Sequence, residues 1–117
     1  MDWLTLTTEN QLEEINQKSF DSLVTGILLL KHSTRCSISS MALNRLERGW
    51  QFSPDTFPAY YLDLLKYPSI SAKIAEMFNI KHESPQVLIV KNGRCIYSAS
   101  HSDISIAAIQ SAIATTI

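Results

Sequence analysis

Cys36 is the residue whose type and position most clearly favour chemistry. It follows a strand-like apolar run at residues 26–31 and opens a helix-like segment at 37–48. A thiol at such a junction lies near the free N–H groups of the first helical turn, which together with the helix dipole favour an anion. Arg35 places a cation next to the thiol, and His32 is expected to lie nearby. The sequence therefore predicts an activated thiolate suited to thiol–disulfide exchange.

Ser39 completes a C-x-x-S pattern, because it stands where a dithiol oxidoreductase has its second cysteine. The pattern arises often by chance in a chain with many serines. Its weight comes from the strand-to-helix junction at which it occurs. A buried and inert Cys36 is the alternative to a reactive one.

The second cysteine, Cys95, follows the hairpin signal Asn92-Gly93. If these two residues form the turn, Cys95 lies opposite Val90, and His101 lies opposite Ser84. Five strand residues at about 3.4 Å each then place Cys95 roughly 17 Å from the far end of the hairpin. A disulfide requires Cα atoms within about 7 Å. We therefore expect Cys95 to be a small core residue, and the chemistry to use one thiol.

Ser84-Pro85 directly precedes a predicted strand at 86–91. In a chain with the order of elements given below, this position predicts a cis-proline loop. The Ser84 backbone would then pair with an extended substrate beside Cys36. A trans proline at the start of an edge strand is the alternative. His101 is expected to face this loop, either to contact a bound anion or as a mere polar cap. The histidines and cysteines show no metal-ligand spacing, so no metal is predicted.

The elements that position these residues alternate along the chain in the order β-α-β-α-β-α-β-β-α. Alternating units predict a parallel sheet with helical crossovers, to which the final hairpin adds an antiparallel edge. This plan, a mixed α/β sheet, is that of the thioredoxin fold. The expected strands are 2–6, 27–31, 59–65, 86–91 and 94–100; the expected helices follow Thr8, span 37–48 with Gly49 as the stop, follow Pro68, and span 104–114. The apolar stripes expected to face the sheet are Leu12, Ile15, Phe20 and Leu23 in the first helix and Ile38, Met41, Ala42 and Leu46 in the second.

Composition limits the class of protein. The 117 residues, 45% of them hydrophobic, suit a single domain over 1–117. A net charge of −1 with interspersed signs gives no basic stripe, so nucleic acid is not an expected partner. No apolar run is long enough for a membrane span or a signal peptide. Two cysteines form no disulfide framework, so we expect a cytoplasmic protein in a reducing compartment.

Several segments together resemble the YtxJ family, the monothiol bacilliredoxins of the bacillithiol redox system. The resemblance covers residues 9–110, and its most specific part is the block Lys81 to Gln86 followed by Ala99-Ser100-His101. The other matching segments are Thr34 to Ser39, Tyr61-Leu62-Asp63, Ile70-Ser71 and Ile74-Ala75.

The resemblance implies a thioredoxin-like fold and a nucleophile, Cys36, that accepts bacillithiol from bacillithiolated proteins. Bacillithiol is then a co-substrate, no cofactor is bound, and a second low-molecular-weight thiol or a partner frees the cysteine. Pro85 is carried over as the cis-proline. The residues themselves add Thr34, Arg35 and Ser84 as expected substrate-binding residues, with Ser39 and His101 as further candidates. Family members usually have C-P-I-S at the active thiol, whereas this chain has Ser37 in place of the proline. That serine restores an N–H donor beside the sulfur.

Two other functions compete with this interpretation. A thioredoxin-like body could dock extended segments at the Ser84-Pro85 edge without turnover. Alternatively, a C-x-x-S thiol could help to hold an iron–sulfur cluster between two subunits, as in monothiol glutaredoxins. The sequence does not name the client proteins, the partner reductase or the oligomeric state.

Overall fold

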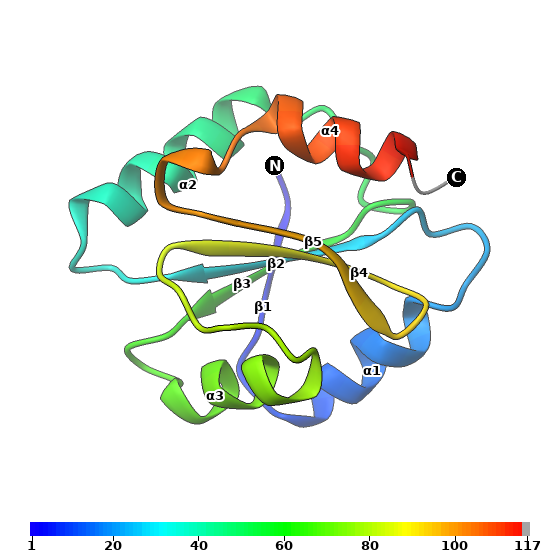
Figure 1. Cartoon of the computed structure of the whole chain (residues 1–117), viewed down its shortest axis with the longest axis horizontal. Coiled ribbons are helices and arrows are strands. Elements are labelled where there is room, and N and C mark those ends of the chain that lie inside the picture. The colour runs from blue at the N-terminus through cyan, green and yellow to red at the C-terminus, as the bar shows by residue number, and fades with distance from the viewer. Residues whose placement is uncertain (116–117) are drawn as a thin grey trace.

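A five-stranded mixed sheet forms the centre of the molecule in the computed structural model, which describes residues 1–115 (Figure 1). The strand order is β1-β3-β2-β4-β5. Strands β1, β3 and β2 run parallel, β4 is antiparallel to β2, and β5 is antiparallel to β4. The bounds are β1 Trp3–Thr5, β2 Ile27–His32, β3 Ala59–Asp63, β4 Gln86–Lys91 and β5 Arg94–Ser100.

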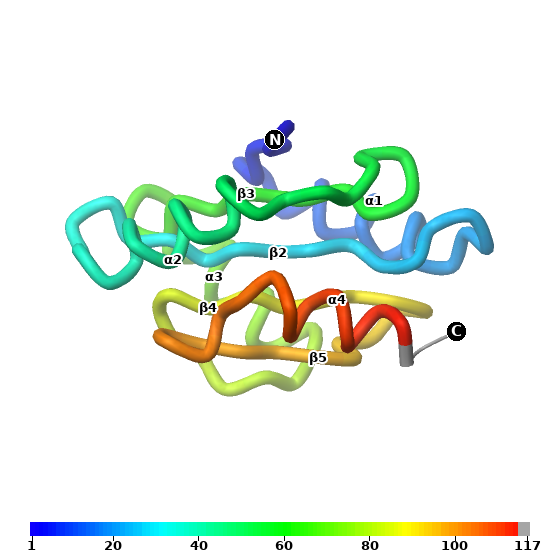
Figure 2. The backbone as a smooth tube through the Cα atoms, turned by 90° about the horizontal axis from the view of Figure 1, so that it is seen from above, coloured from blue at the N-terminus to red at the C-terminus, as the bar shows by residue number. Residues whose placement is uncertain are grey.

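Helices cover both faces of this sheet. Helices α1 and α3 lie on one face, and α2 and α4 lie on the other (Figure 1). Seen from above, α4 lies over the β4–β5 side of the sheet (Figure 2). None of the helices within residues 1–115 has the length and apolar character needed to cross a membrane. The bounds are α1 Asn10–Lys18, α2 Ser37–Gly49, α3 Pro68–Met77 and α4 Ile106–Thr115, with a short 3₁₀ helix, η1, at His101–Asp103.

Strand β2 holds the two layers together because all six of its residues are buried. Leu29 packs into the apolar cluster under α1 and α3, whereas Leu28 and Leu30 pack into the cluster under α2 and α4. Burial of one such leucine stabilises the fold by roughly 1.5–3 kcal/mol. The continuous apolar run that predicted a central strand therefore contributes side chains to the apolar clusters on both faces of the sheet.

Two of the predicted apolar stripes are shorter than expected. Helix α1 ends at Lys18, so Phe20 and Leu23 lie beyond the helix, and their side chains are 59% and 76% exposed. In α2, Ala42 and Leu46 face the sheet as predicted, but Ile38 and Met41 are 53% and 60% exposed. The spacing of apolar residues correctly predicted a helix, but the sheet covers fewer of these residues than the spacing suggested.

The hairpin also differs from the simple register. Val90 pairs with Cys95 as predicted, but Ile89 pairs with Tyr97, because a bulge adds one residue to β5. The hairpin forms the antiparallel edge that the sequence predicts, since β4 is antiparallel to β2 and β5 is antiparallel to β4. The bulge moves every later residue of β5 by one position relative to β4.

The ends of two helices were also misplaced. The last helix begins after Ser105 and not at residue 104, because η1 occupies the residues just before it. Ser105 Oγ accepts a hydrogen bond from Ala108 N at 3.1 Å. Gly49 is the last residue of α2 rather than a residue beyond it. A Cβ atom there would lie 2.8 Å from Ile106 Cγ1, so the glycine permits close packing of α4 on α2.

Candidate active site

Cys36 occupies the N-cap of α2, as the sequence predicts. Its backbone is extended, with φ −105° and ψ 120°, and its side chain is half-buried. A tight turn precedes it, in which Cys36 N donates to Ser33 O at 3.1 Å. Ser40 N then donates to Cys36 O at 3.1 Å and begins the helical ladder. The thiol therefore stands where the first N–H groups of a helix are free to face an anion.

The turn before Cys36 is held by the buried side chain of Ser39. Ser39 Oγ accepts a hydrogen bond from Ser33 N at 3.1 Å and lies 2.6 Å from His32 Nδ1. The hydroxyl is therefore engaged by two groups of the turn, Ser33 N and His32 Nδ1. Ser39, expected as a possible substrate contact, instead joins the end of β2 to the start of α2.

His32 does not supply the extra positive charge that its position suggested. It is 3% exposed, and its ring packs against Tyr61 with a centroid distance of 5.4 Å. Burial lowers its pKa, and this outweighs the opposing effects of the Asp63 charge, a hydrogen bond to the Ser39 backbone and the Glu47 charge. The ring is therefore neutral near pH 7.

Replacing Ser39 with alanine is expected to destabilise this junction. The change leaves Ser33 N–H and His32 Nδ1 without their partner, so the free energy of unfolding should fall by roughly 1–3 kcal/mol. Urea unfolding of the variant measures this, and Ser37→Ala, on the exposed side of the same turn of helix, is the matched control. Equal stability of the two variants would contradict the assigned role of Ser39.

Thr34 and Arg35 form the exposed part of the turn before the thiol. Within residues 1–115, neither side chain makes a hydrogen bond or an ion pair. Both are therefore open to a ligand beside Cys36. The charge of Arg35 suits an anion at that place.

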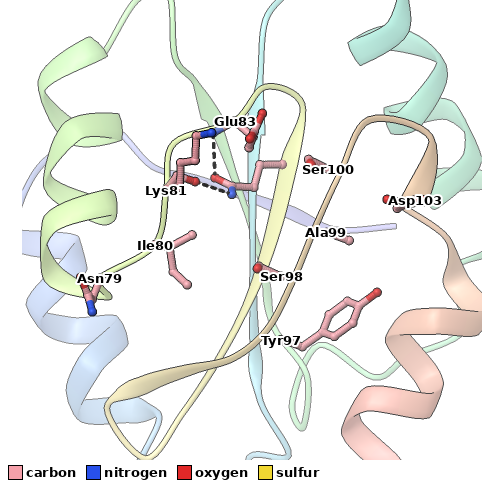
Figure 3. A pocket seen from close by; sticks show the side chains of 10 residues that line it. Asn79, Ile80, Lys81, Glu83, Tyr97, Ser98, Ala99, Ser100 and Asp103 are labelled. Carbon is pink, nitrogen blue, oxygen red and sulfur yellow. Dashed lines mark hydrogen bonds between the residues drawn. The ribbon is translucent and has the colours of Figure 1, made fainter.

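The Ser84-Pro85 peptide bond is cis, as predicted, and Pro85 is buried. The backbone groups of Ser84 form no hydrogen bond to any other group in the described part of the chain. The loop around them is fixed by the buried Gln86, whose Nε2 donates to Lys81 O at 2.9 Å and whose Oε1 accepts from Glu83 N at 3.4 Å (Figure 3). On its outer side this loop and β5 line a surface hollow of about 630 Å³.

Strand pairing brings this loop to the thiol's edge of the sheet. Lys31 near the end of β2 pairs with Gln86 at the start of β4. The residues after β2 lead to Cys36, and the residues before β4 are Ser84 and Pro85. Both segments lie at the same end of the sheet (Figure 1). The sequence-based expectation that they meet is therefore consistent with the observed register.

His101 faces Pro85 rather than Ser84, because of the bulge in β5. Its N–H donates to Pro85 O at 3.0 Å, and its exposed ring lies 3.9 Å from Glu83 Oε2. Arg45 of α2 fixes the same segment by donating from Nη2 to His101 O at 3.3 Å and to Ile104 O at 3.2 Å. Nothing in the sequence indicated that Arg45 joins these elements.

Lys31 and His82 form a second unpredicted contact, behind the loop. The Lys31 side chain is 0% exposed, and its Nζ lies 3.2 Å from His82 Nδ1. Ser71 Oγ, from α3, lies 3.3 Å from the same nitrogen. Burial lowers the pKa of Lys31 to about 8. The pKa of His82 is lowered by burial and then by the Lys31 charge, against a smaller opposing effect of Glu83.

Cys95 lies at the opposite end of the hairpin from the Pro85 loop, one pair away from the Asn92-Gly93 turn. Its side chain packs against the core under α1 and α3, and its Sγ donates to Tyr97 O at 3.1 Å. Burial raises its pKa. Both cysteines are free thiols. Cys95 is thus placed as predicted, as a core residue remote from Cys36.

Comparison with known proteins supports these features. The family model of the monothiol bacilliredoxin BrxC matches residues 4–109. The chain belongs to this family. The resemblance to YtxJ-type bacilliredoxins that the sequence indicated is therefore confirmed.

Solved structures agree on the fold of this bacilliredoxin. A candidate oxidoreductase with a thioredoxin fold is 28% identical, with a TM-score of 0.78 over 93% of this chain and 91% of the other. Thioredoxin of Malassezia sympodialis is 16% identical, with a TM-score of 0.72 over 97% and 90%. Mitochondrial thioredoxin 3 of Saccharomyces cerevisiae is 18% identical, with a TM-score of 0.70 over 97% and 94%. The predicted thioredoxin-like fold is confirmed.

Proposed function

We propose that this protein removes bacillithiol from mixed disulfides of other proteins through Cys36 alone. One observation carries the proposal: Cys36 stands at a helix N-cap at the same end of the sheet as the Ser84 backbone, and the position of a resolving cysteine holds the buried Ser39. Membership of the monothiol bacilliredoxin family supports the choice of bacillithiol as co-substrate. The expected setting is the cytoplasm.

The reaction is a thiol–disulfide exchange. The Cys36 thiolate attacks the bacillithiol sulfur of a protein–S–S–bacillithiol adduct. A new S–S bond forms between Cys36 and bacillithiol as the original S–S bond breaks, and the client leaves as a thiolate that takes a proton from water. No electrons are gained or lost overall, because one disulfide replaces another. The client is therefore released with a free thiol.

Substrate binding is assigned to the two segments that flank the thiol. The free backbone groups of Ser84 are suited to pair with an extended stretch of the client, with Pro85 fixing the loop behind it. The exposed Arg35 and Thr34 are suited to bind the anionic groups expected on bacillithiol. His101 lies one step further along the same edge.

Release of bacillithiol from Cys36 requires an external thiol, because Cys95 lies at the other end of the hairpin. A second low-molecular-weight thiol, or a partner reductase, attacks the Cys36–bacillithiol disulfide and restores the thiolate. The cycle therefore uses one protein thiol and one small thiol.

A test of this function follows the bacillithiol group itself. The protein is incubated with a bacillithiolated client, and the intact mass and peptide map of each product are measured. We expect one bacillithiol on Cys36, none on Cys95, and an equal amount of free client thiol. A group found on Cys95 would contradict the assignment of the thiol.

Absence of any adduct would instead favour the second candidate, a non-catalytic module that docks extended segments at the Ser84-Pro85 edge. The exposed Ile38 and Met41 beside the thiol favour this candidate, because they give a docking surface that needs no chemistry. Co-purification of the intact mixed disulfide with the protein would then be expected.

A further inference from the structure

The buried amine of Lys31 has no role in the exchange reaction described above. It is surrounded by core side chains on β2 and β3 and by the neutral Gln86 on β4. Its one hydrogen-bond partner within residues 1–115 is His82. An ionisable group buried without a carboxylate opposes folding, and such groups are concentrated at functional sites. We therefore consider where Lys31 lies relative to the end of the sheet that carries Cys36 and Ser84.

The partner of Lys31 lies in the loop that carries the client-docking backbone. His82 belongs to residues 81–86, only two positions before Ser84. Its ring is held between the amine of Lys31 on β2 and the hydroxyl of Ser71 on α3, at 3.2 and 3.3 Å. The His82 side chain is exposed and also lines a surface hollow of about 370 Å³ beside α3.

We propose that Lys31, His82 and Ser71 are positioning residues that hold the 81–86 loop so that Ser84 can dock a client's mixed disulfide. This inference rests on the proposed function, since it concerns the same docking edge. Gln86 fixes the loop from inside by two backbone contacts, and the Lys31–His82 contact fixes it from behind. The loop is thus tied to β2, the strand that leads to Cys36.

The charged state of this cluster is defined by the few groups that face it. Nδ1 of His82 can accept a bond from the protonated amine only while Nδ1 itself is unprotonated. The cation and burial both lower the pKa of His82, and Glu83 in the same loop acts in the opposite direction. From the other elements come the neutral Ser71 of α3, Gln86 of β4 and Leu62 of β3. Near pH 7 the cluster therefore carries one positive charge, on the Lys31 amine.

The test compares a large substrate with a small one. Lys31→Met removes the amine at nearly constant volume, and Leu62→Met, on the neighbouring strand, is the matched control. We expect Lys31→Met to exchange about 10-fold more slowly with a bacillithiolated protein, since loop misplacement affects docking. The rate with a small aromatic disulfide, which needs no backbone pairing, should stay within about 2-fold. A purely structural role would alter both rates alike or neither.

A second pair of variants tests the same contact from its other partner, His82. His82→Asn keeps an acceptor near the position of Nδ1, whereas His82→Ala removes it. Faster exchange of His82→Asn than of His82→Ala with the protein substrate, at equal rates with the small disulfide, supports the proposal. Equal rates for the two variants overturn it.

The two proposals fail in different ways. If the wild-type protein reacts with the bacillithiolated client and Lys31→Met reacts equally fast, the positioning role is overturned and the proposed function stands. If the wild-type protein reacts with the small disulfide but not with the client, the proposed function is overturned, and the positioning role with it.

Discussion

Replacement of Cys36 by serine is expected to lower the rate of bacillithiol removal at least about 1,000-fold, because the sole nucleophile is lost. A serine hydroxyl is not ionised near neutral pH and does not attack a disulfide sulfur at a useful rate. The fold should be retained, because Cys36 is half-buried at an N-cap where serine is a favoured residue. Release of free client thiol, followed over time, measures the rate.

Cys95→Ser is the control for this loss. Cys95 lies near the hairpin turn, far along β5 from the Pro85 loop, so its removal should change the rate by less than about 2-fold. Some destabilisation is expected, since its side chain packs against the core. If Cys95→Ser lost activity while Cys36→Ser kept it, the assignment of the nucleophile would be reversed.

The Ser39→Cys variant tests whether the lack of a second thiol at position 39, or the burial of that position, prevents dithiol chemistry. The residue stands at the spacing of a resolving cysteine, but its side chain is buried against His32. A second thiol there would lose both hydrogen bonds of the hydroxyl. The proposed use of a single thiol therefore follows from the burial of position 39 between α2 and β2, as well as from the presence of serine there.

Much of the fold could be predicted because its signals are local. The apolar run of β2, the Asn92-Gly93 turn and the proline that begins α3 each determine structure through their immediate neighbours. The bulge in β5 depends instead on how β4 and β5 pair, and no local pattern indicated it, because either strand alone reads as regular.

The site was predictable only in part, for a similar reason. Cys36 and Pro85 were found because each stands at a recognisable junction between elements. The contact of Lys31 with His82 joins residues 51 positions apart, and Lys31 looked like the polar end of an apolar strand. The exposure of Ile38 and Met41 depends on which turn of α2 the sheet covers. The missed features all depend on how elements distant in the sequence come together, which residue type alone does not indicate.

Lys31→Met is expected to raise the free energy of unfolding by about 1–3 kcal/mol at pH 7, since it removes a buried amine that opposes folding. Lys31 has a pKa of about 8 in the folded protein against 10.5 for the free side chain. Between these values the unfolded chain binds more protons than the folded one, so the stability of the wild type rises with pH. The advantage of the variant is therefore full below about pH 8 and shrinks toward pH 10.5.

Urea unfolding of both proteins at pH 7 and pH 10 measures this difference. Lys18→Met, which removes an exposed lysine of α1, is the matched control and should change stability by less than about 0.5 kcal/mol at either pH. A variant that is less stable than the wild type at pH 7, or a difference that does not change with pH, would contradict the assigned burial of the amine. A more stable variant that docks clients poorly would show that Lys31 opposes folding and is retained for its effect on the loop, since a residue kept for stability alone could not produce both results.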